Sequence, residues 1–142
     1  MTLSGDQAAA VKATVDAVMS DIDGHSQDFF IFYLKQHPGD IAKFPNYKGK
    51  AVDSLKSVPQ FPSHVKGVVS DVFNHFAIAG DAAALSAKAK QTKKDHVPRN
   101  VGHTEFGNLL SSLTPYLQQH LGGSFNAGAW GAASALILNA LD

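Results

Sequence analysis

Two of the seven histidines in this sequence of 142 residues lie on apolar helical stripes, where a nitrogen ligand could face an enclosed site. His64 stands one helical turn before Val68, so both side chains point the same way. His96 completes a stripe that steps by four, three and four residues from Leu85 and ends before Pro98. The remaining histidines are predicted at helix ends, in loops or in polar surroundings, without a metal-binding role: His25, His37, His75, His103 and His120.

If their two helices face each other, His64 and His96 would bracket a flat cavity with apolar walls. Such a site is too apolar and too poor in carboxylates for zinc-dependent hydrolysis, and the sequence has no HExxH motif. The absence of cysteine excludes iron–sulfur clusters, zinc knuckles and disulfides. The pair suits a flat apolar cofactor whose iron needs one nitrogen ligand and one polar neighbour. We therefore hypothesise haem.

All the elements that must position these residues are expected to be helices. Ser4 and Gln7 have the spacing of a capping box, and the dipeptide Asp23-Gly24 is expected to end the first helix. Pro115 lies inside a later helix and is expected to kink it. No alternating strand pattern competes, so we predict an all-α fold of six to eight helices in a single domain, residues 1–142. The expected helices cover approximately residues 4–22, 26–37, 51–57, 63–79, 82–97, 104–121 and 126–141.

Composition argues against several classes of partner. Twelve basic and twelve acidic residues cancel, so net charge favours neither nucleic acid nor an anionic membrane. No apolar run approaches the ~20 residues of a membrane span. We expect no secretory leader, because the first helix cap directly follows Met1. A cytoplasmic protein is predicted, and a processed circulating protein stays open as the alternative.

The order and spacing of several segments resemble the globin family over essentially the whole chain. The likeness is strongest to the haemoglobins and myoglobins of molluscs, annelids and insect larvae. In globins a proline turn is followed six residues later by a phenylalanine that wedges against haem, as Pro38 and Phe44 are here. Further matching segments are the aromatic-plus-glycine corner 47–50, the start of the distal helix 61–64 with Val68, the proximal segment 94–101 followed by Glu105 and Phe106, and Trp130 in the last helix.

The resemblance implies haem b as the cofactor, with His96 as the proximal ligand of its iron. The second ring nitrogen of His96 is then expected to donate to the backbone carbonyl of Thr92, one turn earlier. His64 would be the distal histidine, whose N–H donates a hydrogen bond to bound O2 and a weaker one to CO. Thr92 departs from the family pattern, because a larger apolar residue is common there. A looser proximal pocket is therefore expected.

The same resemblance implies apolar contacts on both faces of the haem. Phe44 would pack flat against it, Val68 would lie beside the sixth coordination site, and Phe30 would crowd the ligand and exclude water. The other residues expected to contact haem lie on the proximal side and at the edge, where basic side chains could pair with the propionates: Val101, Phe106, Arg99 and Lys94.

Reversible binding of O2 for storage or transport is the implied function, with CO and NO as further ligands and no enzymatic activity. A globin peroxidase or nitric-oxide dioxygenase is one alternative. Efficient peroxidases usually add a distal arginine, and none stands near His64 in sequence. A six-coordinate sensor, in which His64 binds the iron directly, is the other. We expect a monomer or a homodimer, without nucleic-acid or membrane partners.

Overall fold

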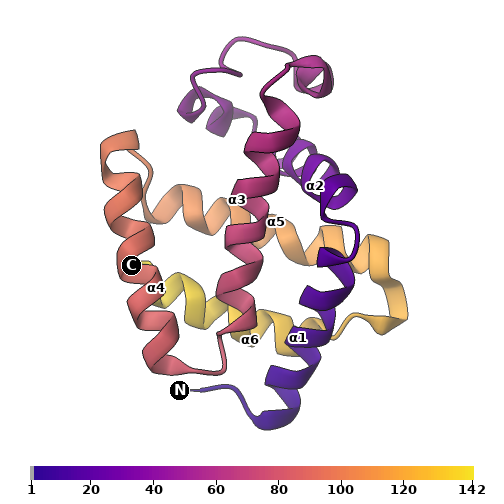
Figure 1. The fold of residues 1–142 in the computed structure, drawn as a ribbon, viewed down its shortest axis with the longest axis vertical. Coiled ribbons are helices and arrows are strands. Elements are labelled where there is room, and N and C mark those ends of the chain that lie inside the picture. Colours follow the sequence, from indigo (N-terminus) through magenta and orange to yellow (C-terminus); the bar gives the residue numbers. More distant parts are fainter. Residues whose placement is uncertain (1) are drawn as a thin grey trace.

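The computed structural model describes residues 2–142, which form six α-helices and four 3-10 helices and contain no strand. The all-α prediction is therefore confirmed. None of the helices in this range is long and apolar enough to cross a membrane. The helices are α1 (Gly5–Met19), α2 (Ile22–Gln36), η1 (Pro38–Lys43), η2 (Val52–Ser57), α3 (Phe61–Ala77), α4 (Ala82–His96), η3 (Val97–Arg99), α5 (His103–Leu121), η4 (Gly122–Ser124) and α6 (Ala127–Ala140) (Figure 1).

The break between the first two helices differs from the prediction. The capping box at Ser4 and Gln7 is present, but α1 ends at Met19 and α2 begins at Ile22. Gly24 therefore lies inside α2 and does not end a helix. A β-carbon at Gly24 would lie 3.0 Å from a carboxylate oxygen of Asp21. The glycine allows this carboxylate to pack against the first turn of α2, and its small size explains its position better than helix termination does.

Helix α3 passes through the middle of the molecule and packs against α1, α2 and α6 (Figure 1). The C-terminal end of α3 packs against the single tryptophan of the chain, Trp130 on α6. The rings of Phe76 and Trp130 stack with centroids 3.8 Å apart at an angle of 9°. Both residues are almost wholly buried. This contact anchors the C-terminal half of α3 in the core, so its N-terminal half is held at a defined place against α2.

A buried polar contact fixes the corner after α2. The Tyr33 hydroxyl donates to the Asp40 carboxylate over 2.6 Å, and the Asn108 amide of α5 donates to the same carboxylate over 3.2 Å. Burial and the Asp40 charge both raise the pKa of Tyr33, so this hydroxyl stays protonated as a donor. Lys43 then donates to the backbone carbonyl of Asn100 over 2.8 Å. The corner that carries Phe44 is thus tied to α5 and to the segment that follows η3.

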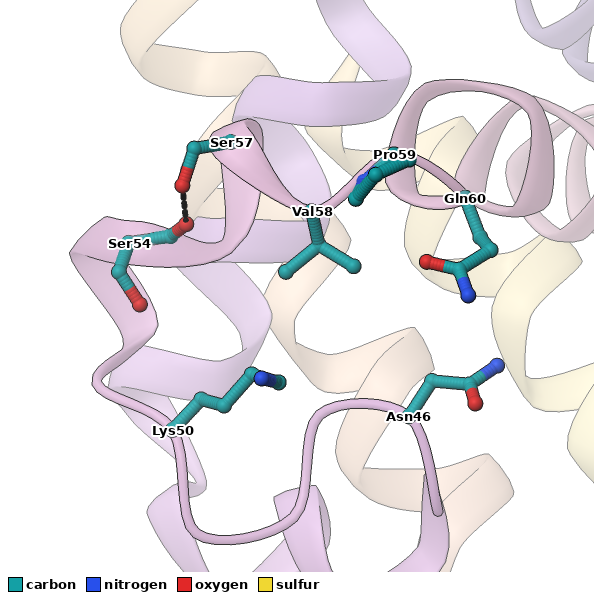
Figure 2. A pocket seen from close by; sticks show the side chains of 7 residues that line it. All are labelled: Asn46, Lys50, Ser54, Ser57, Val58, Pro59 and Gln60. Atoms are coloured by element: carbon teal, nitrogen blue, oxygen red, sulfur yellow. Dashed lines mark hydrogen bonds between the residues drawn. The ribbon is translucent and has the colours of Figure 1, made fainter.

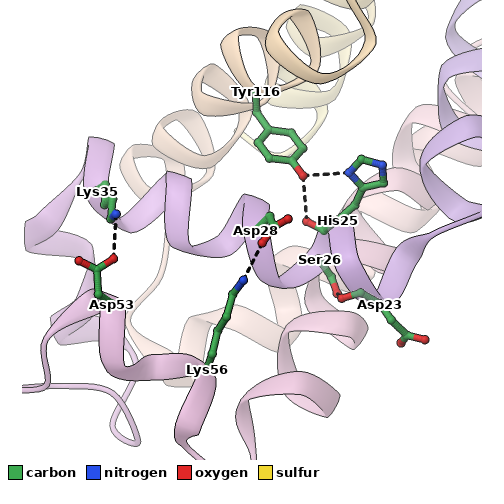
Figure 3. Close-up of polar contacts among 8 residues, drawn as sticks. All are labelled: Asp23, His25, Ser26, Asp28, Lys35, Asp53, Lys56 and Tyr116. Atoms are coloured by element: carbon green, nitrogen blue, oxygen red, sulfur yellow. Dashed lines mark hydrogen bonds and ion pairs between the residues drawn. The ribbon is translucent and has the colours of Figure 1, made fainter.

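Two ion pairs attach η2 to α2, as Figure 3 shows. Lys35 lies 2.8 Å from Asp53, and Lys56 lies 2.7 Å from Asp28. All four side chains are at least half exposed, so each pair contributes no more than about 1 kcal/mol. Together they orient η2 without contributing much to stability.

Candidate functional site

Helices α3 and α4 are antiparallel and joined by a short turn, so the start of α3 and the end of α4 lie at the same end of the pair (Figure 1). His64 is in the first turn of α3, and His96 is the last residue of α4. The two histidines that the sequence analysis paired therefore lie on separate, antiparallel helices at the same end of the pair. About midway along the pair, Lys88 of α4 and Asp71 of α3 form a partly exposed ion pair of 2.7 Å.

On the proximal side, His96 has one nitrogen engaged and one available. Its Nδ1 donates to the Thr92 carbonyl over 2.7 Å, which is the hydrogen bond expected from the sequence. Because a carbonyl only accepts, the proton of the neutral ring lies on Nδ1 and the lone pair lies on Nε2. The Phe106 ring of α5 packs edge-on against the imidazole, with centroids 5.2 Å apart. The ring is thus oriented from two sides as a metal ligand would be.

On the distal side, His64 is half-buried and bonded through Nδ1 as well. The Tyr47 hydroxyl lies 2.7 Å from this nitrogen. Burial lowers the pKa of His64, and the positive charge of Arg99 lowers it further, so the neutral imidazole is favoured. Nε2 takes no part in the hydrogen bonds of the described chain and is the atom left for a ligand.

An aromatic cluster surrounds His64. Phe30 of α2 is fully buried, and its ring meets those of Phe44, Tyr47 and Phe61 edge-on at centroid distances of 5.1 to 6.1 Å. The Phe30 and Phe44 rings lie 6.2 and 6.1 Å from the His64 imidazole. Phe30 and Phe44, two of the predicted distal residues, therefore both pack against His64. They come from α2 and from the corner after η1.

The other predicted residues differ in how far their side chains are exposed to solvent. Val68, Val101 and Phe106 are half-buried, and Arg99 is exposed at the end of η3. The backbone N–H of Val101 donates to the His96 carbonyl over 3.3 Å. Thr92 is buried, and its hydroxyl points toward α3. Lys94 is exposed.

These residues fit a haem better than a metal ion held by side chains. In residues 2–142 no three histidine, cysteine or acidic side chains come together as ligands. His96 and His64 instead each leave Nε2 without a hydrogen bond in the described chain. Val97, next to His96, is 74% exposed, although a valine gains by burial. A flat apolar group that brings most of its own metal ligands would need one of these nitrogens as a ligand and would cover apolar surface of this kind.

One functional candidate was missed by the sequence analysis. His75 was expected in polar surroundings, but it is 3% exposed on α3. Its Nδ1 donates to the Asp71 carbonyl over 2.7 Å, and its Nε2 lies 3.0 Å from the Thr92 hydroxyl. Thr92 also holds His96 through its carbonyl. His75 therefore contacts the turn of α4 that orients His96. Its position on the apolar stripe, three residues after Val72 and seven after Val68, was the available signal.

His75 makes the stability of the protein dependent on pH. Burial lowers its pKa below the ordinary 6.5, despite the opposing effect of Asp71. The unfolded chain then binds the proton at higher pH than the folded chain, so the stabilising contribution is complete above about pH 6.5 and is lost as pH falls. In His75→Gln we expect this loss to disappear, with a slope smaller by up to about 1.4 kcal/mol per pH unit.

Urea unfolding at about pH 7.5 and pH 5 measures this slope in the wild type and in His75→Gln. His103→Gln is the matched control, because His103 is exposed at the start of α5. Equal slopes for the wild type and His75→Gln would contradict the prediction.

Figure 2 shows a separate surface depression of about 470 Å³ between the loop before η2 and the start of α3. Its lining is mainly polar and contains no histidine, and it shares no residue with the predicted site. The residues that line it are Asn46, Lys50, Ser54, Ser57, Val58, Pro59 and Gln60. We assign it no role, because nothing in it could ligate iron.

A sequence profile of the globin family matches residues 27–141. The chain belongs to the globin family. This globin is 32% identical to a globin of the mollusc Nerita albicilla, over 99% of this chain and 92% of the relative. It is also 32% identical to globin CTT-V of Chironomus thummi piger, over 90% of this chain and 78% of that one.

The fold of this globin is shared with a solved structure. Ferric myoglobin of Aplysia limacina superimposes with a TM-score of 0.87, covering 99% of this chain and 97% of the myoglobin at 23% identity. The prediction of a globin fold, and of molluscan and insect-larva relatives, is therefore confirmed.

Proposed function

We propose that this globin binds haem b between α3 and α4 and, through it, binds O2 reversibly for storage or transport. The observation that carries the proposal is the arrangement of the two histidines. Each imidazole is held through Nδ1 by a partner of its own, Thr92 or Tyr47, and each leaves Nε2 for a ligand. The proposal extends to CO and NO as ligands and to one domain over residues 1–142.

The residues have distinct roles in this function. Haem supplies the ferrous iron that O2 binds without net chemistry. His96 would hold the iron through Nε2, and its bond to the Thr92 carbonyl fixes the tautomer and raises the basicity of the ring. His64 would donate its N–H to O2, whose partial negative charge would strengthen the hydrogen bond.

Apolar side chains complete the proposed pocket. Phe44 and Val68 are half-buried on the distal side, and Phe106 is half-buried against His96. Covering them with haem removes apolar area from water and contributes about 25 cal/mol per Å². Phe30 is fully buried against the distal histidine, so it keeps water from that side. Exclusion of water and protons slows oxidation of the iron. Arg99, exposed at the end of η3, and Lys94 are proposed to pair with the propionates.

Peroxide cleavage is a second candidate, because the charge of Arg99 reaches His64 and lowers its pKa. A cation near the distal histidine is what a peroxidase uses to stabilise a departing oxygen. Arg99 is exposed and lies in η3, after the proximal histidine. This placement favours a propionate partner over a catalytic distal group, and we rank O2 binding first.

An absorption spectrum of the haem-loaded protein, reduced and then exposed to air, tests the proposal. We expect a five-coordinate ferrous spectrum that converts to a stable oxygenated form and returns under vacuum. A reduced spectrum that is already six-coordinate would favour a sensor. Immediate oxidation to ferric protein, with rapid turnover of added peroxide, would favour an oxidative enzyme.

A further inference from the structure

A single hydrogen bond joins the loop before η2 to the distal histidine. The Tyr47 hydroxyl lies 2.7 Å from His64 Nδ1, and the two rings are 5.5 Å apart at an angle of 50°. Tyr47 is 0% exposed, so water does not reach its hydroxyl. Within residues 2–142 this is the one hydrogen bond that the hydroxyl makes. Its proton must therefore go to His64 or stay unpaired inside the protein.

The direction of this bond follows from the chemistry of the two groups. A phenol O–H is a good donor, and the unprotonated nitrogen of a neutral imidazole is a good acceptor. If Nδ1 donated instead, the Tyr47 proton would be buried without an acceptor, which is unfavourable. The lowered pKa of His64 agrees with a neutral ring. Tyr47 therefore donates, Nδ1 carries the lone pair, and the imidazole proton is on Nε2.

We propose that Tyr47 is a positioning residue that holds His64 in the Nε2–H tautomer, and thereby favours O2 as ligand over direct binding of His64 to iron. This role rests on the proposed function. Tyr47 would select between a pocket that binds O2 and a six-coordinate state in which His64 binds the iron. An Nε2–H can donate to O2, but it cannot coordinate a metal. To coordinate, the proton must move to Nδ1, where it would meet the Tyr47 hydroxyl and leave that hydroxyl without an acceptor.

The Tyr47 ring is held firmly enough to impose this choice. Its edge packs against Phe61 with centroids 5.6 Å apart, and against Phe30 at 6.1 Å. The backbone N–H of Tyr47 donates to the Phe44 carbonyl over 2.9 Å. Gly49, with a φ of 81°, then turns the chain in a conformation that other residues rarely adopt. The hydroxyl is thus fixed by side-chain packing and by the local turn, and His64 is restrained from swinging toward solvent.

Tyr47→Phe removes the hydroxyl and keeps the ring. The chain offers a matched control, because the buried Tyr116 hydroxyl of α5 lies 2.9 Å from His25 Nδ1 near the start of α2 (Figure 3). Tyr116→Phe removes the same kind of bond away from the site. In Tyr47→Phe, but not in Tyr116→Phe, we expect O2 dissociation to become about 3- to 10-fold faster. We also expect a six-coordinate component to appear in the reduced spectrum.

The tautomer itself is measured by the nitrogen-15 shifts of His64 in the diamagnetic ferrous–CO protein and in the haem-free protein. In the wild type we expect a protonated Nε2 and an unprotonated Nδ1, with a mixture in Tyr47→Phe. The wild-type measurement needs no variant, so a folding failure of Tyr47→Phe does not remove the test. A proton on Nδ1 in the wild type overturns the proposal, as does O2 dissociation from Tyr47→Phe no faster than from Tyr116→Phe.

Failure of the proposed function is distinguishable. If the protein does not bind O2 reversibly, or if His64→Val leaves O2 dissociation unchanged, the O2-binding role of His64 is wrong. If His64→Val accelerates dissociation and Tyr47→Phe does not, only the role of Tyr47 is wrong. The haem-free tautomer reports on Tyr47 in either case.

Discussion

Replacing His96 with glycine is expected to leave the protein folded but unable to retain haem. The imidazole is the single side chain at the end of α4 that offers a free nitrogen toward the site. Loss of a partner that merely orients a metal ligand reduces metal affinity roughly 10- to 100-fold, so loss of the ligand itself should reach at least about 100-fold. Transfer of haem to an apoprotein acceptor in excess, followed by absorption, measures the rate of loss.

Added imidazole provides the control for His96→Gly, because it can enter the space that the side chain vacates. We expect it to restore a five-coordinate ferrous spectrum and to slow haem loss. His103→Ala, at an exposed position on α5, should behave as the wild type. Retention of haem by His96→Gly with an unchanged spectrum would mean that another residue holds the iron.

Replacing His64 with valine is expected to accelerate O2 dissociation about 10- to 100-fold, with a much smaller effect on CO. A hydrogen bond to a partly charged acceptor contributes roughly 1.5–3 kcal/mol, which corresponds to that range. CO develops less negative charge and gains less from the N–H. Autoxidation should also become faster. Stopped-flow displacement of O2 by CO, with the wild type alongside, measures the change, and equal O2 dissociation rates would refute the distal role.

His64→Val has a second expected effect, on stability. Without His64, the buried Tyr47 hydroxyl loses its acceptor, and an unpaired buried donor destabilises the fold by about 1–3 kcal/mol. The double variant with Tyr47→Phe should recover most of this loss while O2 dissociation stays fast. The double variant therefore separates the contribution of His64 to ligand binding from its contribution to folding.

Much of the fold could be predicted from the sequence, because helices depend on local patterns, whereas most of the residues proposed for the site came from the resemblance to a family. Helical periodicity and caps such as the Ser4–Gln7 capping box act within one turn, and the structure has this capping box. The apolar stripe that ends at His96 can be recognised from the spacing of residues within its own helix. Turn chemistry was less reliable, since Asp23-Gly24 suggested a terminus where packing needed a small residue inside α2.

The hydrogen bonds that join different elements around the site could not be predicted from spacing. Tyr47 and His64 are 17 positions apart and belong to different elements, and the same separation joins His75 to Thr92. Neither pair has a periodic relation. Each bond exists because tertiary packing brings a loop or a second helix into contact. Such contacts decide which nitrogen carries the proton in His64 and His75. The sequence therefore predicted the bond of His96 to Thr92, which lies within one helical turn, but not the tautomers of His64 and His75.

The stacked pair at the far end of α3 provides the molecule with an intrinsic optical reporter. Trp130 is the single tryptophan, so tryptophan emission comes from one place in the core. Its indole N–H is buried and has no hydrogen-bond partner in the described chain, and an apolar setting of this kind shifts emission to short wavelength. In the haem-free forms of the variants at His64, His96 and Tyr47, unchanged emission would show that the α3–α6 contact is intact. A red shift would instead reveal that the core itself has opened.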